Sequence, residues 1–170
     1  TITHTANGKK DPWWRVDLQN NYSIERITIF NRQDSCCTFR LADFKVEILN
    51  GNTVEWEYTH VGTPDYKTDI NVQMPDGSLV VGDLVKVWLE GESETLSLAE
   101  VQVWSSDAPP PTPPPTPAPT RPPSSPDLQN VALGKPASQS TTGWGGVASR
   151  GVDGGTSGSW GSRTITHTAN

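Results

Sequence analysis

Hydrophobic and polar residues alternate along several short stretches of this chain. The hydrophobic positions of the clearest stretches are Phe44, Val46 and Ile48; Val85, Val87 and Leu89; and Val101 and Val103. A period of two predicts strands with one buried face. Two further runs, residues 13–18 and 24–30, are separated by a polar turn predicted at residues 19–21, and no stretch has a convincing helical period. Short strands with regular turns predict an all-β fold, a jelly-roll β-sandwich.

A proline-rich segment interrupts this pattern. Residues 109–126 contain 11 prolines in 18 positions, with threonine, alanine and serine between them. Such a segment has no core of its own and favours a polyproline II linker that extends about 3.1 Å per residue. We place the linker at residues 107–126.

The two ends of the chain carry the same heptapeptide, because residues 1–7 recur unchanged as residues 164–170. This repetition indicates either one period of a tandem array or a permuted chain in which the residues at the junction occur twice. Residues 1–106 are then the C-terminal two-thirds of one module, and residues 127–170 are the N-terminal third of the next, or permuted same, module. Residues 127–170 either complete a neighbouring copy or fold back onto residues 1–104. A stiff spacer favours the neighbouring copy.

Composition narrows the classes of function. The net charge of −6 and a pI near 4.9 argue against nucleic acid, which requires clustered basic residues. No apolar run approaches the roughly 20 residues that span a bilayer. A glycosylation sequon at Asn21 and the threonines of the spacer (Thr112, Thr116 and Thr120) predict a secreted, extracellular glycoprotein.

The candidate chemistry gathers in residues 32–40, which contain Arg32, Asp34, Cys36, Cys37 and Arg40. Two arginines can donate hydrogen bonds to sugar oxygens, and a strained disulfide between adjacent cysteines would offer a small apolar plate. The alternative is two buried free thiols with two solvated arginines. Glycosidases generally need two convergent carboxylates, and this cluster has one, so we expect a binding module and not an enzyme.

Residues of this cluster and others before it resemble the F-type lectin (fucolectin) signature, and the similarity covers nearly everything except the spacer. The segment 130–140 also matches the opening of such a module. The resemblance implies L-fucose binding on a calcium-stabilised β jelly roll, similar to discoidin-like folds. The matching residues are His4, Asp11, Trp13, Trp14, Arg15, Asp17, Leu18, Asn31, Arg32, Asp34, Cys36, Cys37 and Arg40.

The resemblance also implies roles for individual residues. His4 or its copy His167, with Arg32 and Arg40, would hydrogen-bond the fucose, and a Cys36–Cys37 disulfide would pack against the sugar ring. Trp160 is the first candidate for the wall of the pocket that holds the C6 methyl group, and Trp144 is the second. Asp34 would hold the arginines in position. In the family pattern the cysteine pair directly follows the aspartate, whereas Ser35 lies between them here. We therefore expect one arginine to be shifted and the affinity for fucose to be altered.

Calcium is the cofactor that the resemblance implies. Calcium takes six to eight oxygen ligands, and these readily include backbone carbonyls. The matching positions lie early in the module and at its last strand: Arg150, Asp153, Gly155 and Thr164 (with its copy Thr1), and Ala99 and Glu100.

The expected partners are fucosylated glycans and neighbouring copies of the same module. The alternative function is structural, with lectin-fold modules that mainly assemble with each other in an extracellular fibre or matrix.

Overall fold

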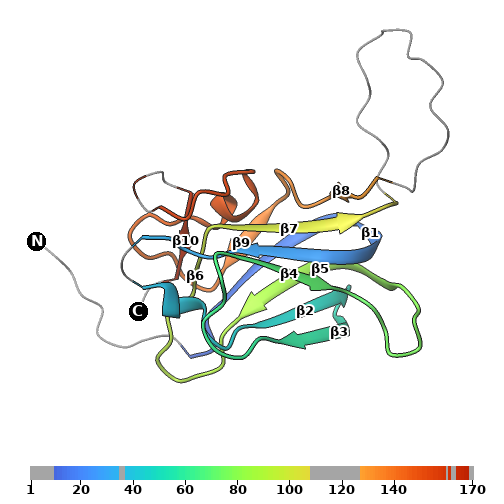
Figure 1. Cartoon of the computed structure of the whole chain (residues 1–170), viewed down its shortest axis with the longest axis horizontal. Helices are drawn as coiled ribbons and strands as arrows, with labels where there is room; N and C mark the ends of the chain where they lie inside the picture. Colours follow the sequence, from blue (N-terminus) through green and yellow to red (C-terminus); the bar gives the residue numbers. More distant parts are fainter. Residues whose placement is uncertain (1–9, 35–36, 108–126, 160, 162–163, 169–170) are drawn as a thin grey trace, which may run out of the picture.

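The computed structural model describes residues 10–34, 37–107, 127–159, 161 and 164–168. Several positions named above lie outside these residues, namely Thr1, His4, Ser35, Cys36, the spacer threonines Thr112, Thr116 and Thr120, and Trp160. The described residues form the strands β1 (Trp13–Phe30), β2 (Lys45–Asn50), β3 (Thr53–Thr59), β4 (Lys67–Asn71), β5 (Val80–Trp88), β6 (Ser97–Leu98), β7 (Glu100–Ser105), β8 (Gln129–Asn130), β9 (Ala137–Gln139) and β10 (Thr166–His167) (Figure 1). Two 3₁₀-helices accompany them, η1 (Thr38–Leu41) and η2 (Ala148–Val152).

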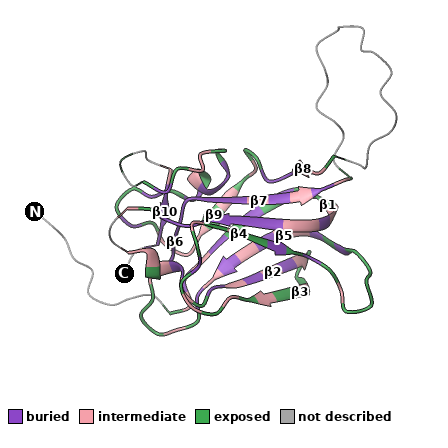
Figure 2. Ribbon diagram, in the orientation of Figure 1, coloured by how far each residue is buried: buried purple, intermediate pink, exposed green. Residues whose placement is uncertain are grey.

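The alternating stretches are strands, as predicted. Residues 45–48 lie in β2, residues 85–88 lie in β5, and residues 101–103 lie in β7, while Phe44 and Leu89 directly flank their strands. Their hydrophobic side chains are buried, while the residues between them are mostly half-buried (Figure 2). The fold is an antiparallel β-sandwich, and the all-β prediction is confirmed.

The turn predicted at residues 19–21 is wrong. Residues 13–30 form one long strand, β1, because both halves pair antiparallel with β5 and only the register shifts between Asp17 and Tyr22. Gln19 has a positive φ of 67°, and its N–H donates to Asp17 Oδ1 at 2.8 Å. The polar run is therefore a β-bulge, which bends a strand without ending it.

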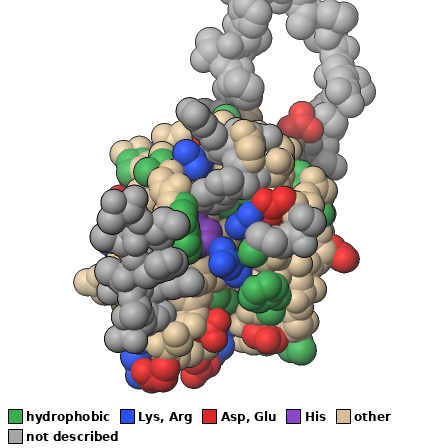
Figure 3. Space-filling view, turned by 90° about the vertical axis from the view of Figure 1, so that its left-hand side faces the viewer, with side chains coloured by type: hydrophobic (Ala, Val, Ile, Leu, Met, Phe, Trp, Pro, Cys, Tyr) green, Lys and Arg blue, Asp and Glu red, His purple; other side chains and the backbone are tan. Residues whose placement is uncertain are grey.

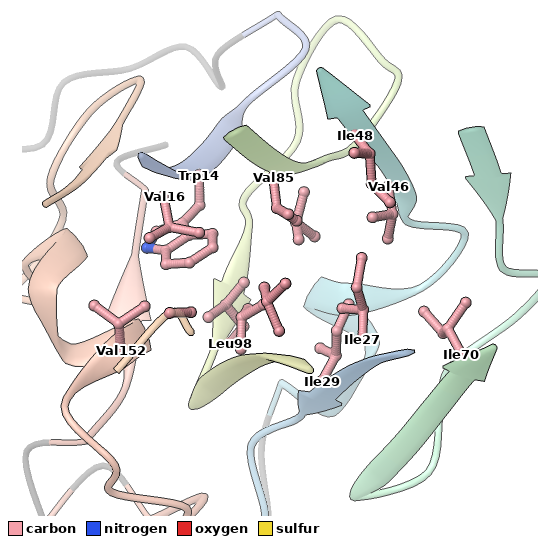
Figure 4. Packing of buried hydrophobic residues seen from close by; sticks show 14 of the residues in the cluster. Trp14, Val16, Ile27, Ile29, Val46, Ile48, Ile70, Val85, Leu98 and Val152 are labelled. Carbon is pink, nitrogen blue, oxygen red and sulfur yellow. The ribbon is translucent and has the colours of Figure 1, made fainter. Parts of the chain in front are cut away.

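The bend in β1 makes the two layers of the sandwich. Residues 13–17 pair with β5 and β9, residues 22–24 continue the pairing with β5, and residues 24–30 pair with β7 and, from 26 onward, with β4. Figure 4 shows the result, with Val46, Ile48 and Val85 on one layer facing Ile27 and Ile70 on the other. Burying a side chain of this size contributes about 1.5–3 kcal/mol, so this interior is the main source of stability.

Segments from both sides of the spacer complete the sandwich. In this single chain, β8 pairs with β7, β9 pairs with β1, and β10 pairs with β6. The described strands that follow the spacer thus pair with strands that precede it. Trp14 anchors the returning segment, because its buried indole Nε1 donates to Ala148 O at 2.9 Å. Gly151 lies against that indole, and a Cβ there would come within 2.8 Å of the ring.

Among the described residues, no helix has both the length and the apolar character that a membrane crossing requires.

Candidate functional site

The loop that follows β1 is closed by Asn31, whose side chain is buried. Its Oδ1 accepts the N–H of Arg32 at 2.7 Å, and its Nδ2 donates to Thr38 O at 3.1 Å and to Pro64 O at 3.4 Å. These bonds hold both ends of the loop 32–38 to one side chain. Asn31 was part of the sequence motif without a role, and its position directly after a buried strand was the available signal.

Arg32 and Asp34 form a two-pronged ion pair inside this loop. Arg32 Nε donates to Asp34 Oδ1 at 2.7 Å, and Nη2 donates to Oδ2 at 2.5 Å. The Arg32 side chain is 6% exposed, so the pair is largely shielded from water. Parallel bonds of this kind fix the plane of the guanidinium group as well as its position. The structure therefore gives Asp34 the contacts expected of a positioning residue.

Arg40 and His167 meet across 127 positions of sequence, with Arg40 Nη1 and His167 Nε2 2.6 Å apart. Arginine can only donate, so Nε2 is the acceptor and the imidazole is neutral. Burial, followed by the charge of Arg40, lowers the pKa of His167 to about 4. Burial and the charge of Arg32 lower the pKa of Arg40, while Asp34 opposes this shift. The C-terminal copy of the histidine thus joins the arginines.

A short loop before η2 holds the backbone of His167. Gly143 N–H donates to His167 O at 2.8 Å, and His167 N–H donates to Gly146 O at 2.9 Å. Gln139 Nε2 bridges the two segments, since it lies 3.0 Å from both Gly146 O and His167 O. A Cβ at Gly146 would lie 2.7 Å from His167 Cβ, which leaves room for glycine only. Sequence reasoning assigned no role to Gln139 or Gly146, because their contacts are long-range.

Trp144 stands at the tip of this loop. Its ring packs edge-on against His167, with centroids 4.7 Å apart, and the Arg40 guanidinium carbon lies 5.9 Å from its centroid. Positive φ angles at Trp144 (45°) and Gly145 (72°) turn the side chain outward, where it is 64% exposed. Trp160 lies outside the described residues, so the structure places the second candidate, Trp144, at the site.

Cys37 is the N-cap residue of η1, with a φ of 74°, and is disulfide-bonded. No cysteine is free among the residues that the structure describes, and Cys36 lies outside them. Figure 3 shows this face of the molecule, where the histidine and basic side chains lie next to exposed hydrophobic side chains. The arrangement offers hydrogen-bond donors beside apolar surface, which suits a small ligand with many hydroxyl groups.

A second polar group lies around Glu100, whose side chain is fully buried. Glu100 Oε1 accepts the N–H of Gly154 at 3.1 Å, and Oε2 has no hydrogen-bond partner among the described residues. Burial raises the pKa of Glu100 to about 7, and the charge of nearby Asp153 adds to this effect. A buried, uncompensated carboxylate is costly unless a cation or a proton accompanies it.

The surroundings of Glu100 fit a calcium ion. Asp153 Oδ1 accepts the N–H of Gly155 at 2.7 Å, and a Cβ on Gly155 would lie 2.8 Å from Thr164 Cγ2, so Asp153, Gly155 and Thr164 are neighbours. Among the described residues, no group of three or more His, Cys, Asp or Glu could hold a metal ion, so a calcium ion here would also need carbonyl oxygens, which calcium accepts. Two further expected calcium positions are Ala99, which directly precedes Glu100, and Arg150, which belongs to η2. Arg150 Nη1 donates to Ile165 O at 3.4 Å.

The known proteins to which this chain is similar include galactose-binding domains and fucolectins. The family model for NedA-like, galactose-binding domains matches residues 1–80. Fucolectin-6 of Anguilla japonica is 36% identical over 106 residues, which cover 61% of this chain and 53% of that protein. Fucolectin of Anguilla anguilla is 35% identical over 107 residues, covering 61% and 65%. This chain spans between about half and two thirds of the length of these curated relatives.

The solved structures that resemble this chain include a lectin domain and a fucose-binding module. The lectin domain of lectinolysin, complexed with Lewis B antigen, superposes with a TM-score of 0.51 at 26% identity, over 58% of this chain and 68% of that one. A fucose-binding module of Streptococcus pneumoniae gives 0.50 at 28% identity, over 57% and 69%. The comparisons support an F-type lectin-like, galactose-binding-domain fold for this chain.

The lowered pKa of His167 predicts a loss of stability in acid. In the unfolded chain a histidine titrates near 6.5, so as pH falls from 6.5 to 4 the unfolded state takes up the proton first. We expect protonation of His167 to lower the free energy of unfolding by about 2–3 kcal/mol across this window, while the raised pKa of Glu100 opposes this change, so the effect is read from the difference between parent and variant. Urea unfolding at several pH values measures it. In His167→Gln, which keeps an acceptor for Arg40 but does not titrate, the free energy of unfolding should fall less in acid than in the parent chain; an equal fall in both would assign the effect to other groups.

Proposed function

We propose that this chain is a lectin module that binds L-fucose at the ends of glycans, is stabilised by calcium and has no enzymatic activity. The observation that carries the proposal is the contact of Arg40 with a neutral, buried His167, beside the Arg32–Asp34 pair. The fucolectins and the fucose-binding module among its relatives support the choice of sugar.

The chemistry of these groups suits a neutral sugar. A guanidinium group has five N–H donors, and Arg40 uses Nη1 on His167, so the remaining donors can serve sugar oxygens. Hydrogen bonds from a charged donor contribute about 1.5–3 kcal/mol each. Trp144 supplies an exposed apolar wall for the C6 methyl group of fucose. A disulfide between Cys37 and its neighbour Cys36 would add the apolar plate against the ring.

Hydrolysis has little support at this site. Asp34 is the carboxylate of the cluster, and both its oxygens accept hydrogen bonds from Arg32. A general acid needs a proton, which an arginine pair opposes, and glycosidases need a second carboxylate nearby. The site is therefore proposed to bind sugar without cleaving it.

Replacing Arg40 tests the proposal. We expect L-fucose to bind saturably to the calcium-loaded chain by isothermal titration calorimetry. Arg40→Ala should weaken binding at least tenfold, because charge-assisted bonds are lost. Arg15→Ala is the matched control, since Arg15 is exposed and packs on Trp13. A folded parent that gives no heat with fucose would contradict the proposal and favour the structural alternative.

Calcium is proposed to bind between η2 and β7. Glu100 and Asp153 would supply carboxylate oxygens, and the carbonyls of Arg150, Gly155, Thr164 and Ala99 are the candidates for the remainder. The unpartnered Glu100 Oε2 supports this assignment. The ion would tie the returning segment to the last long strand, which makes its role structural.

Removing the buried carboxylate tests the calcium site. Calcium in 100-fold excess over its dissociation constant should stabilise the parent by about 2.7 kcal/mol, a rise in Tm on the order of 5–10 °C. Glu100→Gln should abolish this rise, while Glu57→Gln, at an exposed position of β3, should retain it. Differential scanning calorimetry with calcium and with a chelator measures the difference. An equal rise in both variants would remove Glu100 from the site.

The setting proposed for the module is a secreted, glycosylated protein that repeats it. Residues 165–168 fill a buried slot beside β6, and residues 2–5 have the same sequence. This identity supports an array in which residues 164–170 are residues 1–7 of the next period. Asn21, the proposed sequon, is exposed. The same repetition is what favours the alternative, a fibre whose modules mainly assemble with each other.

A further inference from the structure

Two aromatic side chains are exposed among the residues that the structure describes, and both lie on segments that carry residues of this site. Phe39 and Trp144 are each 64% exposed, whereas the other described tryptophans, tyrosines and phenylalanines are buried or half-buried. Trp144 contacts His167 and Arg40, as described above. Phe39 has no role in the proposed fucose contacts, although it precedes Arg40 directly.

The geometry of η1 explains why Phe39 is exposed. A 3₁₀-helix has three residues per turn, so three consecutive side chains point in directions about 120° apart. Leu41 is fully buried in the core, and Arg40 reaches His167, so the remaining direction is taken by Phe39. The bonds from Arg40 N–H to Cys37 O at 3.1 Å and from Ala42 N–H to Phe39 O at 2.8 Å hold this turn.

The backbone at Phe39 is therefore held next to Arg40, and its exposed ring points in a different direction from Arg40. Figure 3 shows exposed hydrophobic side chains on two sides of the histidine and basic groups. A single sugar held by Arg40 and bordered by Trp144 would leave the Phe39 ring free. A second sugar attached to the first would extend past the edge of the site, where a rigid aromatic face can pack on its C–H groups.

We propose that Phe39 is a specificity-determining residue, which contacts the sugar linked to fucose and makes the module prefer fucosylated oligosaccharides to free fucose. This inference rests on the proposed function. Phe39 would add affinity through apolar contact with a hexose ring and would not touch the fucose. Trp144, in contrast, serves both ligands.

Calorimetric titrations of methyl α-L-fucoside and of 2′-fucosyllactose into the full chain test the inference. The parent should bind the trisaccharide more tightly. Phe39→Ala should weaken the trisaccharide about three- to tenfold and change the monosaccharide less than twofold. Phe39→Trp should restore the preference, because it keeps an aromatic face. Leu79→Ala is the matched control, since Leu79 is 56% exposed and immediately precedes β5.

The outcomes separate this inference from the function on which it rests. If the parent binds neither sugar, the proposed function fails and the inference fails with it. If the parent binds both sugars but Phe39→Ala weakens both equally, or weakens neither, only the role of Phe39 is overturned. Thermal melting of each variant shows whether it is folded, and a Phe39→Trp variant that is folded but has lost the preference also contradicts the proposal.

Discussion

The hydrogen bond between Arg40 and His167 is the interaction on which the rest of this site depends. It joins η1, in the first part of the chain, to β10, beyond the spacer. It requires a neutral imidazole, and burial together with the neighbouring arginines keeps His167 neutral. Backbone bonds from Gly143 and Gly146 and the bridging amide of Gln139 then fix the histidine in place. The returning segment thus supplies the histidine that contacts Arg40.

The same short segment links the two candidate ligand sites. Thr164 lies beside Gly155 and Asp153, near the buried Glu100, and His167 lies three residues further along. Ile165, between them, is fully buried against Phe30 and Ala99. A cation at Glu100 would therefore stabilise the segment that carries the histidine. This proximity would give a calcium ion at the proposed site a physical route to influence sugar binding without touching the sugar.

The local pattern of hydrophobic and polar residues predicted much of the fold but less of the candidate site. Alternation at residues 44–48 and 101–103 was sufficient for β2 and β7, because burial of one face sets a period of two. The bulge in β1 was missed, since a polar run within a strand resembles a turn until its pairing with β5 is known. The alternating pattern puts Glu100 among the polar positions of β7, and its burial depends on packing by the loop after η2.

Local sequence pattern also identified some residues of the candidate site and missed others. Arg32, Asp34 and Arg40 were identified because they are close in sequence and match a motif. His4 and His167 have identical surroundings in sequence, so no local rule could choose between them. Gln139 and Gly146 act through contacts with His167, 28 and 21 positions away, and such contacts leave no periodic signal.

A crystal structure of the calcium-loaded chain with L-fucose would test the central claim most directly. The account predicts fucose oxygens within hydrogen-bond distance of the Arg40 and Arg32 guanidinium groups, the C6 methyl group against Trp144, and Arg40 still bonded to His167. Fucose bound at another face of the sandwich, or a bound sugar that leaves Arg40 and His167 untouched, would contradict it.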